Sequence, residues 1–136
     1  MKNIDIDLKI EVESLLGKLG MDYTYDSEIG GWLFREKNSI IFMSVSSITD
    51  IKVLSFFVKL GKLQDTCTKD DLYFLLNQNM NLAFSSFAIS KGNLYMKYVT
   101  QIRELDSEEF LIALKVVNFS IEKCINLIKN LVKPLD

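Results

Sequence analysis

Histidine is absent from this chain of 136 residues, and its absence excludes several kinds of chemistry at once. Histidine is the usual general base near neutral pH, the residue that activates a serine or cysteine nucleophile, and the commonest zinc ligand. Acid–base catalysis or the binding of a hard metal ion would have to rely on paired carboxylates. We therefore expect no catalytic residue, no metal site and no cofactor, and we predict that the protein is not an enzyme.

Cysteine and proline are also scarce, with two cysteines and one proline in the chain. Pro134 lies near the carboxyl end, where it can stop a last helix without disturbing other elements. Cys67 and Cys124 are far apart in the sequence, and we expect two free thiols in a reducing compartment rather than a disulfide. Cys124 falls on the apolar side of a predicted helix, which is typical of a small core residue.

Long apolar runs and an excess of positive charge are missing as well. Residues 1–7 lack the basic stretch and apolar run of a signal peptide, and no window reaches the ~18 uninterrupted apolar residues of a membrane span. Sixteen basic residues against eighteen acidic ones give a net charge of −2, which disfavours a nucleic-acid backbone as the main ligand. We expect a cytoplasmic protein that binds neither nucleic acid nor a membrane.

The overall composition is that of a folded domain, with 49% hydrophobic and 25% charged residues. No linker, repeat or low-complexity tract divides the sequence. We therefore treat residues 1–136 as a single domain.

Three segments carry apolar residues at spacings of three and four, the pattern of an amphipathic helix. The first begins at Asp5 or Asp7 and ends at Gly17 or Gly20. Its buried stripe is expected to consist of Leu8, Val12, Leu15, Leu16 and Leu19.

The second predicted helix begins at Thr68, with Asp71 in the place of the glutamate of a capping box. Its expected buried stripe contains Leu72, Leu75 and Leu76, with Met80 as a further candidate. The last helix begins at Asp106, has Glu109 to complete the box, and continues for about seven turns. Its stripe consists of Phe110, Leu114, Val117, Ile121, Cys124 or Ile125, Ile128 and Leu131.

Five further segments are rich in β-branched and aromatic residues and are separated by turn residues, as is typical of strands. They span residues 32–36, 40–47, 53–60, 84–90 and 94–101, and Lys91-Gly92-Asn93 forms a hairpin signal. The order α-β-β-β-α-β-β-α predicts an α+β fold with helices against a five-stranded, mostly antiparallel sheet.

Local features along this order resemble type III secretion chaperones and the related YbjN-like proteins, over about residues 8–131. These features are a first helix that ends in Leu19-Gly20, a Tyr/Asp segment over residues 22–26, the segment 72–79, the strand-turn-strand over 84–94, and a last helix that begins with Asp-x-x-Glu. The resemblance implies a small acidic homodimer that binds an extended stretch of a secreted effector around its sheet. YbjN-like members share this fold without the secretion system.

The resemblance also implies a dimer contact on the second helix and on the hairpin of residues 84–101. Rigid aromatic side chains lose little entropy when they are ordered at an interface, so aromatic residues in these two segments are the candidates. The candidate protein-interface residues are Tyr73, Phe74, Phe84, Phe87, Tyr95 and Tyr98.

The strand segments hold more large apolar side chains than one face of a sheet needs. These side chains are Phe56, Phe57, Phe84 and Phe87, together with Leu54, Val58 and Ile89. Helices can cover both groups, or one face can pack against a second copy or a client peptide. A client can also add along a sheet edge and place alternate side chains in pockets.

Pairs of carboxylates occur at the starts of the predicted second and last helices. Asp70 with Asp71, and Glu108 with Glu109, lie where acidic side chains favour the positive end of the helix dipole, as does Glu104 with Asp106. Helix capping explains these pairs. An enzyme with an unrecognised carboxylate site is therefore the least favoured of three functions, behind a chaperone-like protein and a regulatory protein.

The leading interpretation is a non-enzymatic, chaperone-like homodimer that holds a partner polypeptide in an extended form. The alternative is a YbjN-like regulatory or immunity-type protein that binds one folded protein partner. Both place the function in a protein–protein contact.

Overall fold

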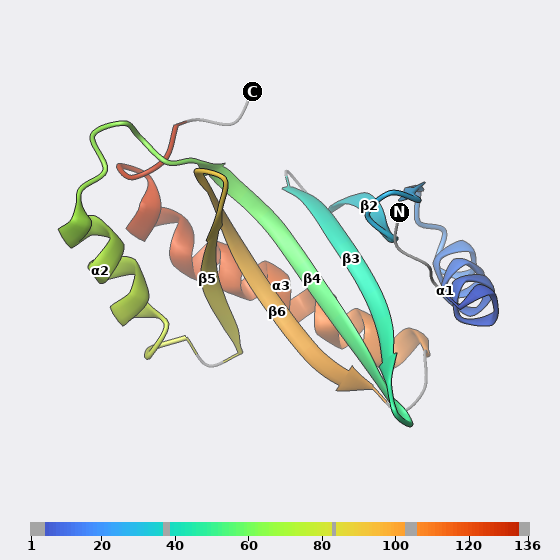
Figure 1. Ribbon diagram of the computed structural model, residues 1–136. Helices are drawn as coiled ribbons and strands as arrows, with labels where there is room; N and C mark the ends of the chain where they lie inside the picture. The colour runs from blue at the N-terminus through green and yellow to red at the C-terminus, as the bar shows by residue number, and fades with distance from the viewer. Residues whose placement is uncertain (1–4, 37–38, 83, 103–105, 134–136) are drawn as a thin grey trace.

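The computed structural model describes residues 5–36, 39–82, 84–102 and 106–133 (Figure 1). The elements follow in the order α1 (Ile6–Lys18), β1 (Tyr23–Asp26), β2 (Gly31–Glu36), β3 (Ser39–Ile48), β4 (Ile51–Lys62), α2 (Lys69–Gln78), β5 (Ser85–Ser90), β6 (Asn93–Ile102) and α3 (Ser107–Ile128). The strands form one six-stranded antiparallel sheet in the order β1-β2-β3-β4-β6-β5. The predicted α+β fold class is confirmed.

The helix starts are set by short side chains that accept hydrogen bonds from the first free backbone N–H groups. Asp5, not Asp7, caps α1, since the Asp7 N–H donates to Asp5 Oδ1 over 2.9 Å. At Thr68 the capping box is complete, with the Asp71 N–H bonded to the hydroxyl at 3.1 Å and the Thr68 N–H bonded to the carboxylate at 2.8 Å. Asp106 caps α3 by accepting from the N–H of Glu109 at 2.8 Å.

The ends of two helices resolve alternatives that the sequence left open. Helix α1 is followed by Gly20 at φ +69°, a left-handed conformation that favours glycine, so the helix ends before Gly20 and runs through Gly17. Helix α3 ends at Ile128, so its 22 residues make about six turns rather than seven. On its buried face lies Cys124, whereas Ile125 is 54% exposed.

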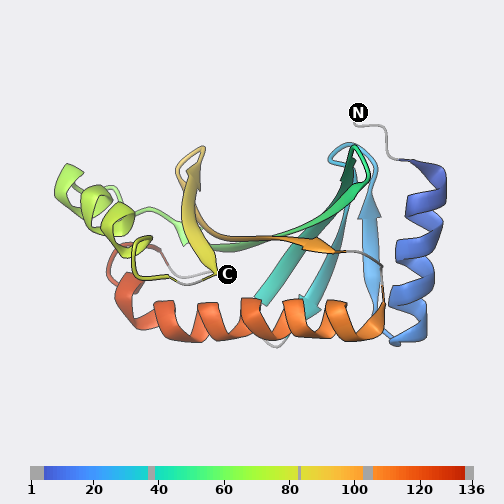
Figure 2. The same ribbon diagram turned by 90° about the horizontal axis from the view of Figure 1, so that it is seen from below.

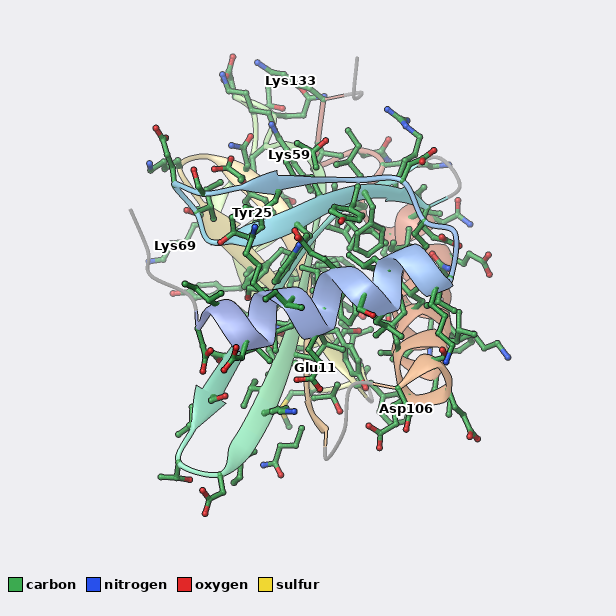
Figure 3. The ribbon with its side chains drawn as sticks, turned by 90° about the vertical axis from the view of Figure 1, so that its right-hand side faces the viewer. Glu11, Tyr25, Lys59, Lys69, Asp106 and Lys133 are labelled. Carbon is green, nitrogen blue, oxygen red and sulfur yellow. The ribbon has the colours of Figure 1, made fainter. Side chains whose placement is uncertain are left out.

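The sheet has one strand more than the sequence predicts. Strand β1 was missed because it is four residues long and polar, and its pattern gives little apolar signal. Its Tyr25 is paired with Trp32 of β2, with ring centroids 5.2 Å apart, and the Lys9 ammonium lies 4.5 Å above the Tyr25 ring. Figure 3 shows Tyr25 beside α1, with Glu11 on the opposite side of that helix.

Helices α1 and α3 pack on one face of the curved sheet, and α2 lies beside β5 (Figures 1 and 2). The core between them contains Phe110 of α3, whose ring lies 6.3 Å from that of Phe34 and 6.2 Å from that of Phe56. Trp32 is fully buried, and its indole N–H donates to Glu13 of α1 over 3.1 Å. Strand residues therefore bury one alternate set of side chains and leave the other set on the opposite face.

The last described residues pair with the segment that follows β4. Leu63 forms an isolated antiparallel bridge with Val132, and the Lys133 N–H donates to the Lys62 carbonyl over 2.7 Å. A Cβ on Gly61 would lie 2.8 Å from the Lys133 carbonyl oxygen, and Gly61 has φ +151°. Glycine is therefore required at this position by both its conformation and the close approach of the chain.

Candidate binding surface

The sheet face opposite α1 and α3 is hollowed into a depression of about 1100 Å³, which we call the trough. Figure 2 shows the sheet curving away from α3, with the open side between the β5–β6 hairpin and the tips of β2, β3 and β4. Most of its lining comes from the alternate strand residues that do not enter the core, including Leu33, Arg35, Phe42, Phe57, Lys59 and Lys97. Helix α1 reaches the trough with Leu8 and its cap Asp5, and no residue of α2 or α3 lines it.

An apolar row crosses the floor of the trough. Leu33 of β2 pairs with Phe42 of β3, and Phe42 pairs with Phe57 of β4. The two phenylalanine rings are tilted by 45° with centroids 6.1 Å apart, a favourable edge-to-face arrangement. All three side chains are only partly buried, so they offer apolar area that a partner can cover.

Hydroxyl groups and cations surround this apolar row. Ser44 pairs with Ser55 across β3 and β4, and both line the trough. Lys97 follows Phe57 along the row, and its ammonium lies 5.6 Å above the Phe57 ring. The surface therefore combines an apolar strip with groups that can bind a carbonyl or carboxylate oxygen.

A second apolar surface lies on the outside of α2. Tyr73 and Leu76 are spaced three residues apart, so they share one helix face, and they are 52% and 62% exposed. Met80, in the turn that follows the helix, is 88% exposed. The predicted burial of Leu76 and Met80 is wrong, and Leu75 alone is fully buried on this helix. Leu72 is partly buried. One face of α2 thus packs against the fold through Leu75, whereas the other face exposes apolar side chains to solvent.

The two edges of the sheet differ in what lies beside them. At the β5 edge, the side chain of Asn79 accepts from the Phe87 N–H over 2.7 Å and donates to the Phe87 carbonyl over 3.4 Å. These bonds satisfy the outward backbone groups of Phe87 as a neighbouring strand would. Strand β1 forms the opposite edge and pairs only with β2 among the described strands.

The candidate interface residues fall in three different environments. Tyr73, Phe74 and Phe84 are exposed, and Tyr95 lines the trough. Phe87 is 7% exposed and belongs to the core. Tyr98 is partly buried against the core and stacks on Phe56 with centroids 6.3 Å apart. The six candidates therefore do not share one exposed surface, since only Tyr73 and Phe74 lie on α2 and Phe87 is buried.

The surplus of apolar side chains is divided between the core and the surface. Leu54, Phe56 and Val58 are buried with Phe87, whereas Phe57 lies in the trough, and Phe84 and Ile89 are exposed. The helices therefore cover one alternate set only. The trough residues Leu33, Arg35, Phe42 and Lys59 were not singled out as functional from the sequence. The signal for them was their position next to buried strand residues in alternating segments.

Thiols and carboxylates are the candidate metal-ligating groups within the described ranges. No group of three or more Cys, Asp or Glu side chains there could hold a metal ion. Cys67 and Cys124 are free thiols, as expected. Burial, and to a smaller extent the Asp71 carboxylate, raise the pKa of Cys67, and burial raises the pKa of Cys124 against the opposing effect of Lys123.

Among the described residues, no helix is both long and apolar enough to cross a membrane.

Two helices packed on one face of an open antiparallel sheet, with a third between β4 and β5, define a type III secretion chaperone-like fold. Among solved structures, a chain from the structure of the HopA1-SchA chaperone-effector complex has this fold, with a TM-score of 0.62 and 14% sequence identity. The match covers 91% of this chain and 99% of that chain. At this identity the likeness concerns the fold. No protein-family model and no curated protein matches the chain.

Proposed function

We propose that this protein is a non-enzymatic, chaperone-like binding module that holds an extended segment of a partner polypeptide. The observation that carries the proposal is the trough, an apolar and hydroxyl-lined sheet face that the described helices leave uncovered. Complete burial of a side chain such as Leu33 or Phe42 contributes about 1.5–3 kcal/mol, so a client that covers the row gains substantial binding energy. The fold likeness to a chain of a chaperone-effector complex is consistent with this role.

The open edge of β1 offers a second mode of contact for the same client. An extended peptide that pairs with an edge strand gains main-chain hydrogen bonds whatever its sequence. At the β5 edge, the Asn79 side chain already makes such hydrogen bonds with the Phe87 backbone. Strand β1 is therefore the favoured edge for pairing with a client. Burial in the trough and pairing at β1 need no ATP and no catalytic group.

A homodimer through α2 forms the second part of the proposal. The outer face of α2 carries Tyr73 and Leu76, and Phe74, Met80 and Phe84 are exposed on the helix or shortly after it in the sequence. Aromatic residues and methionine are enriched at protein interfaces, and an apolar helix face is costly to leave in water. Of the interface candidates, Tyr73, Phe74 and Phe84 would lie in this contact, Tyr95 would touch a client, and Phe87 and Tyr98 would support both from the core side.

The alternative function is a regulator or immunity-type protein that binds one folded partner. The protruding apolar face of α2 favours this alternative, since a helix surface fits a groove on a folded domain.

A peptide array distinguishes the two functions. Short overlapping peptides from proteins encoded beside this one are probed for binding, in parallel with the same proteins in their folded form. A chaperone-like module binds one or a few peptides as tightly as the whole protein. Binding of the folded protein with no binding of any peptide would establish the regulator instead.

A further inference from the structure

The charge of the trough is opposite to the charge of the whole chain. The chain has a net charge of −2, whereas the described residues that line the trough include Arg35, Lys59 and Lys97 against one carboxylate, Asp5. Asp5 is the exposed cap of α1, and its carboxylate already accepts the Asp7 N–H. The floor of the trough therefore presents positive charge.

Within the described residues, no ion pair neutralises these cations. In the described parts of the chain, the ion pairs join Lys9 to Glu13, Lys52 to Glu11 and Lys133 to Asp65, and none involves a trough residue. Arg35 and Lys59 are exposed, and Lys97 contacts the Phe57 ring. A partner that carries carboxylates can pair with them without breaking an existing ion pair.

The strand register spreads the cations across the apolar row. Arg35 pairs with Ile40 of β3, Lys59 pairs with Tyr95 of β6, and Lys97 pairs with Phe57 of β4. With strands about 4.8 Å apart, the three cations are distributed over about 15 Å from β2 to β6. An extended segment needs about five residues to cross this span.

We propose that the segment held in the trough is acidic and amphipathic, with apolar side chains against Phe42 and Phe57 and carboxylates toward Arg35, Lys59 and Lys97. The inference rests on the proposed function and specifies the chemistry of its client. The paired serines Ser44 and Ser55 donate further hydrogen bonds to carboxylate or backbone oxygens. Since Arg35 and Lys59 lie beside the apolar row and Lys97 lies at its end, neither an all-apolar nor an all-acidic segment satisfies the surface.

Three labelled synthetic peptides test the proposal. They share one length and one leucine spacing and carry glutamate, glutamine or lysine at the positions between the leucines. Fluorescence anisotropy with the full chain should show that the glutamate peptide binds about tenfold tighter than the glutamine peptide, with the lysine peptide weakest. The preference should shrink when the salt is raised from about 50 mM to about 500 mM, because partly exposed charge pairs are screened.

Charge reversal in the trough should invert the preference. The triple variant R35E/K59E/K97E is expected to bind the lysine peptide best. The matched control K115E/K123E/K129E makes the same change of net charge at exposed positions of α3 and its C-cap and should behave as the wild type. If the triple variant does not fold, the double variant R35E/K59E changes only exposed side chains and should still abolish the preference for glutamate.

Each contrary result has a distinct meaning. Equal affinity for the glutamate and glutamine peptides overturns the acidic client and leaves the proposed polypeptide binding in place. Absence of binding by all three peptides overturns both proposals. If the trough variant alters the dimer mass and leaves peptide affinity unchanged, a second copy covers the trough and the acidic client is again overturned.

Discussion

Gly31 lies at the start of β2, where the ring of Phe42 leaves no room for a side chain. A Cβ at this position would lie 2.5 Å from both the Met43 carbonyl oxygen and the Phe42 ring. We expect Gly31→Ala to lower the free energy of unfolding by about 1–3 kcal/mol, because the methyl group must displace the ring or the backbone of β3. Urea unfolding measures the change.

Gly17 provides the control for this substitution. It lies inside α1 with nothing within 4 Å of an added Cβ, so Gly17→Ala is expected to raise the free energy of unfolding by up to about 1 kcal/mol. Equal effects of the two substitutions would contradict the packing of Phe42 over Gly31.

The two thiols should differ in reactivity. Cys124 is fully buried and Cys67 is partly exposed, and burial raises the pKa of both, which leaves less of the reactive thiolate. At about pH 8.5, Ellman's reagent should label Cys67 slowly and Cys124 only after unfolding. Since the folded chain keeps Cys124 protonated where the unfolded chain ionises it, stability should decline as the pH rises further. Rapid labelling of both thiols in the native protein would contradict this placement.

Among the elements, α2 is joined to the sheet edge by its C-cap Asn79, which hydrogen-bonds to Phe87 of β5 as a neighbouring strand would. Asn79→Ala removes both bonds to Phe87 and leaves an edge N–H and C=O without a protein partner. We expect the Phe87 amide to exchange faster with solvent and the free energy of unfolding to fall by about 1–2 kcal/mol. Asn81→Ala, an exposed neighbour, is the control. Unchanged exchange at Phe87 would count against the edge contact.

The elements with a clear periodicity of apolar residues could be predicted from the sequence, whereas those without such a pattern could not. The stripe of α3 and the caps at Thr68 and Asp106 follow from local spacing and side-chain chemistry, which act within one element. Strand β1 was missed because its stability comes from pairing with β2 rather than from its own composition. On α2, periodicity identified the apolar residues but not which of its two apolar faces meets the sheet.

The trough was harder to predict from the sequence than the helices and strands were. Arg35 and Lys59 look like ordinary solvated charges in the sequence, because each follows a buried strand residue. Only the order of the strands brings β2, β4 and β6 to one face and collects these cations. Candidate residues drawn from aromatic content included Phe87, whose burial in the core depends on the same strand order.

For the whole molecule, the proposed dimer gives a direct prediction of mass. Light scattering over a wide concentration range should give about twice the chain mass for the wild type. Leu76→Glu places a charge on the exposed apolar face of α2 and should shift the mass toward a monomer. Ile125→Glu, a matched change at a comparably exposed position of α3, should keep the dimer. A wild-type protein that is monomeric at every concentration would contradict the proposed dimer.

The central pairing of β4 with β6 has a consequence for the order of events during synthesis. Lys52 pairs with Ile102 and Lys62 with Asn93, so β4 leaves the ribosome well before the strand that completes its ladder. Until β6 emerges, β4 presents a long free edge with Phe56 and Phe57 on its two faces. Pairings between distant residues are slow to form, and an unpaired edge of this kind invites association with other chains. A protein with the proposed function would therefore itself expose an unpaired apolar strand during its synthesis.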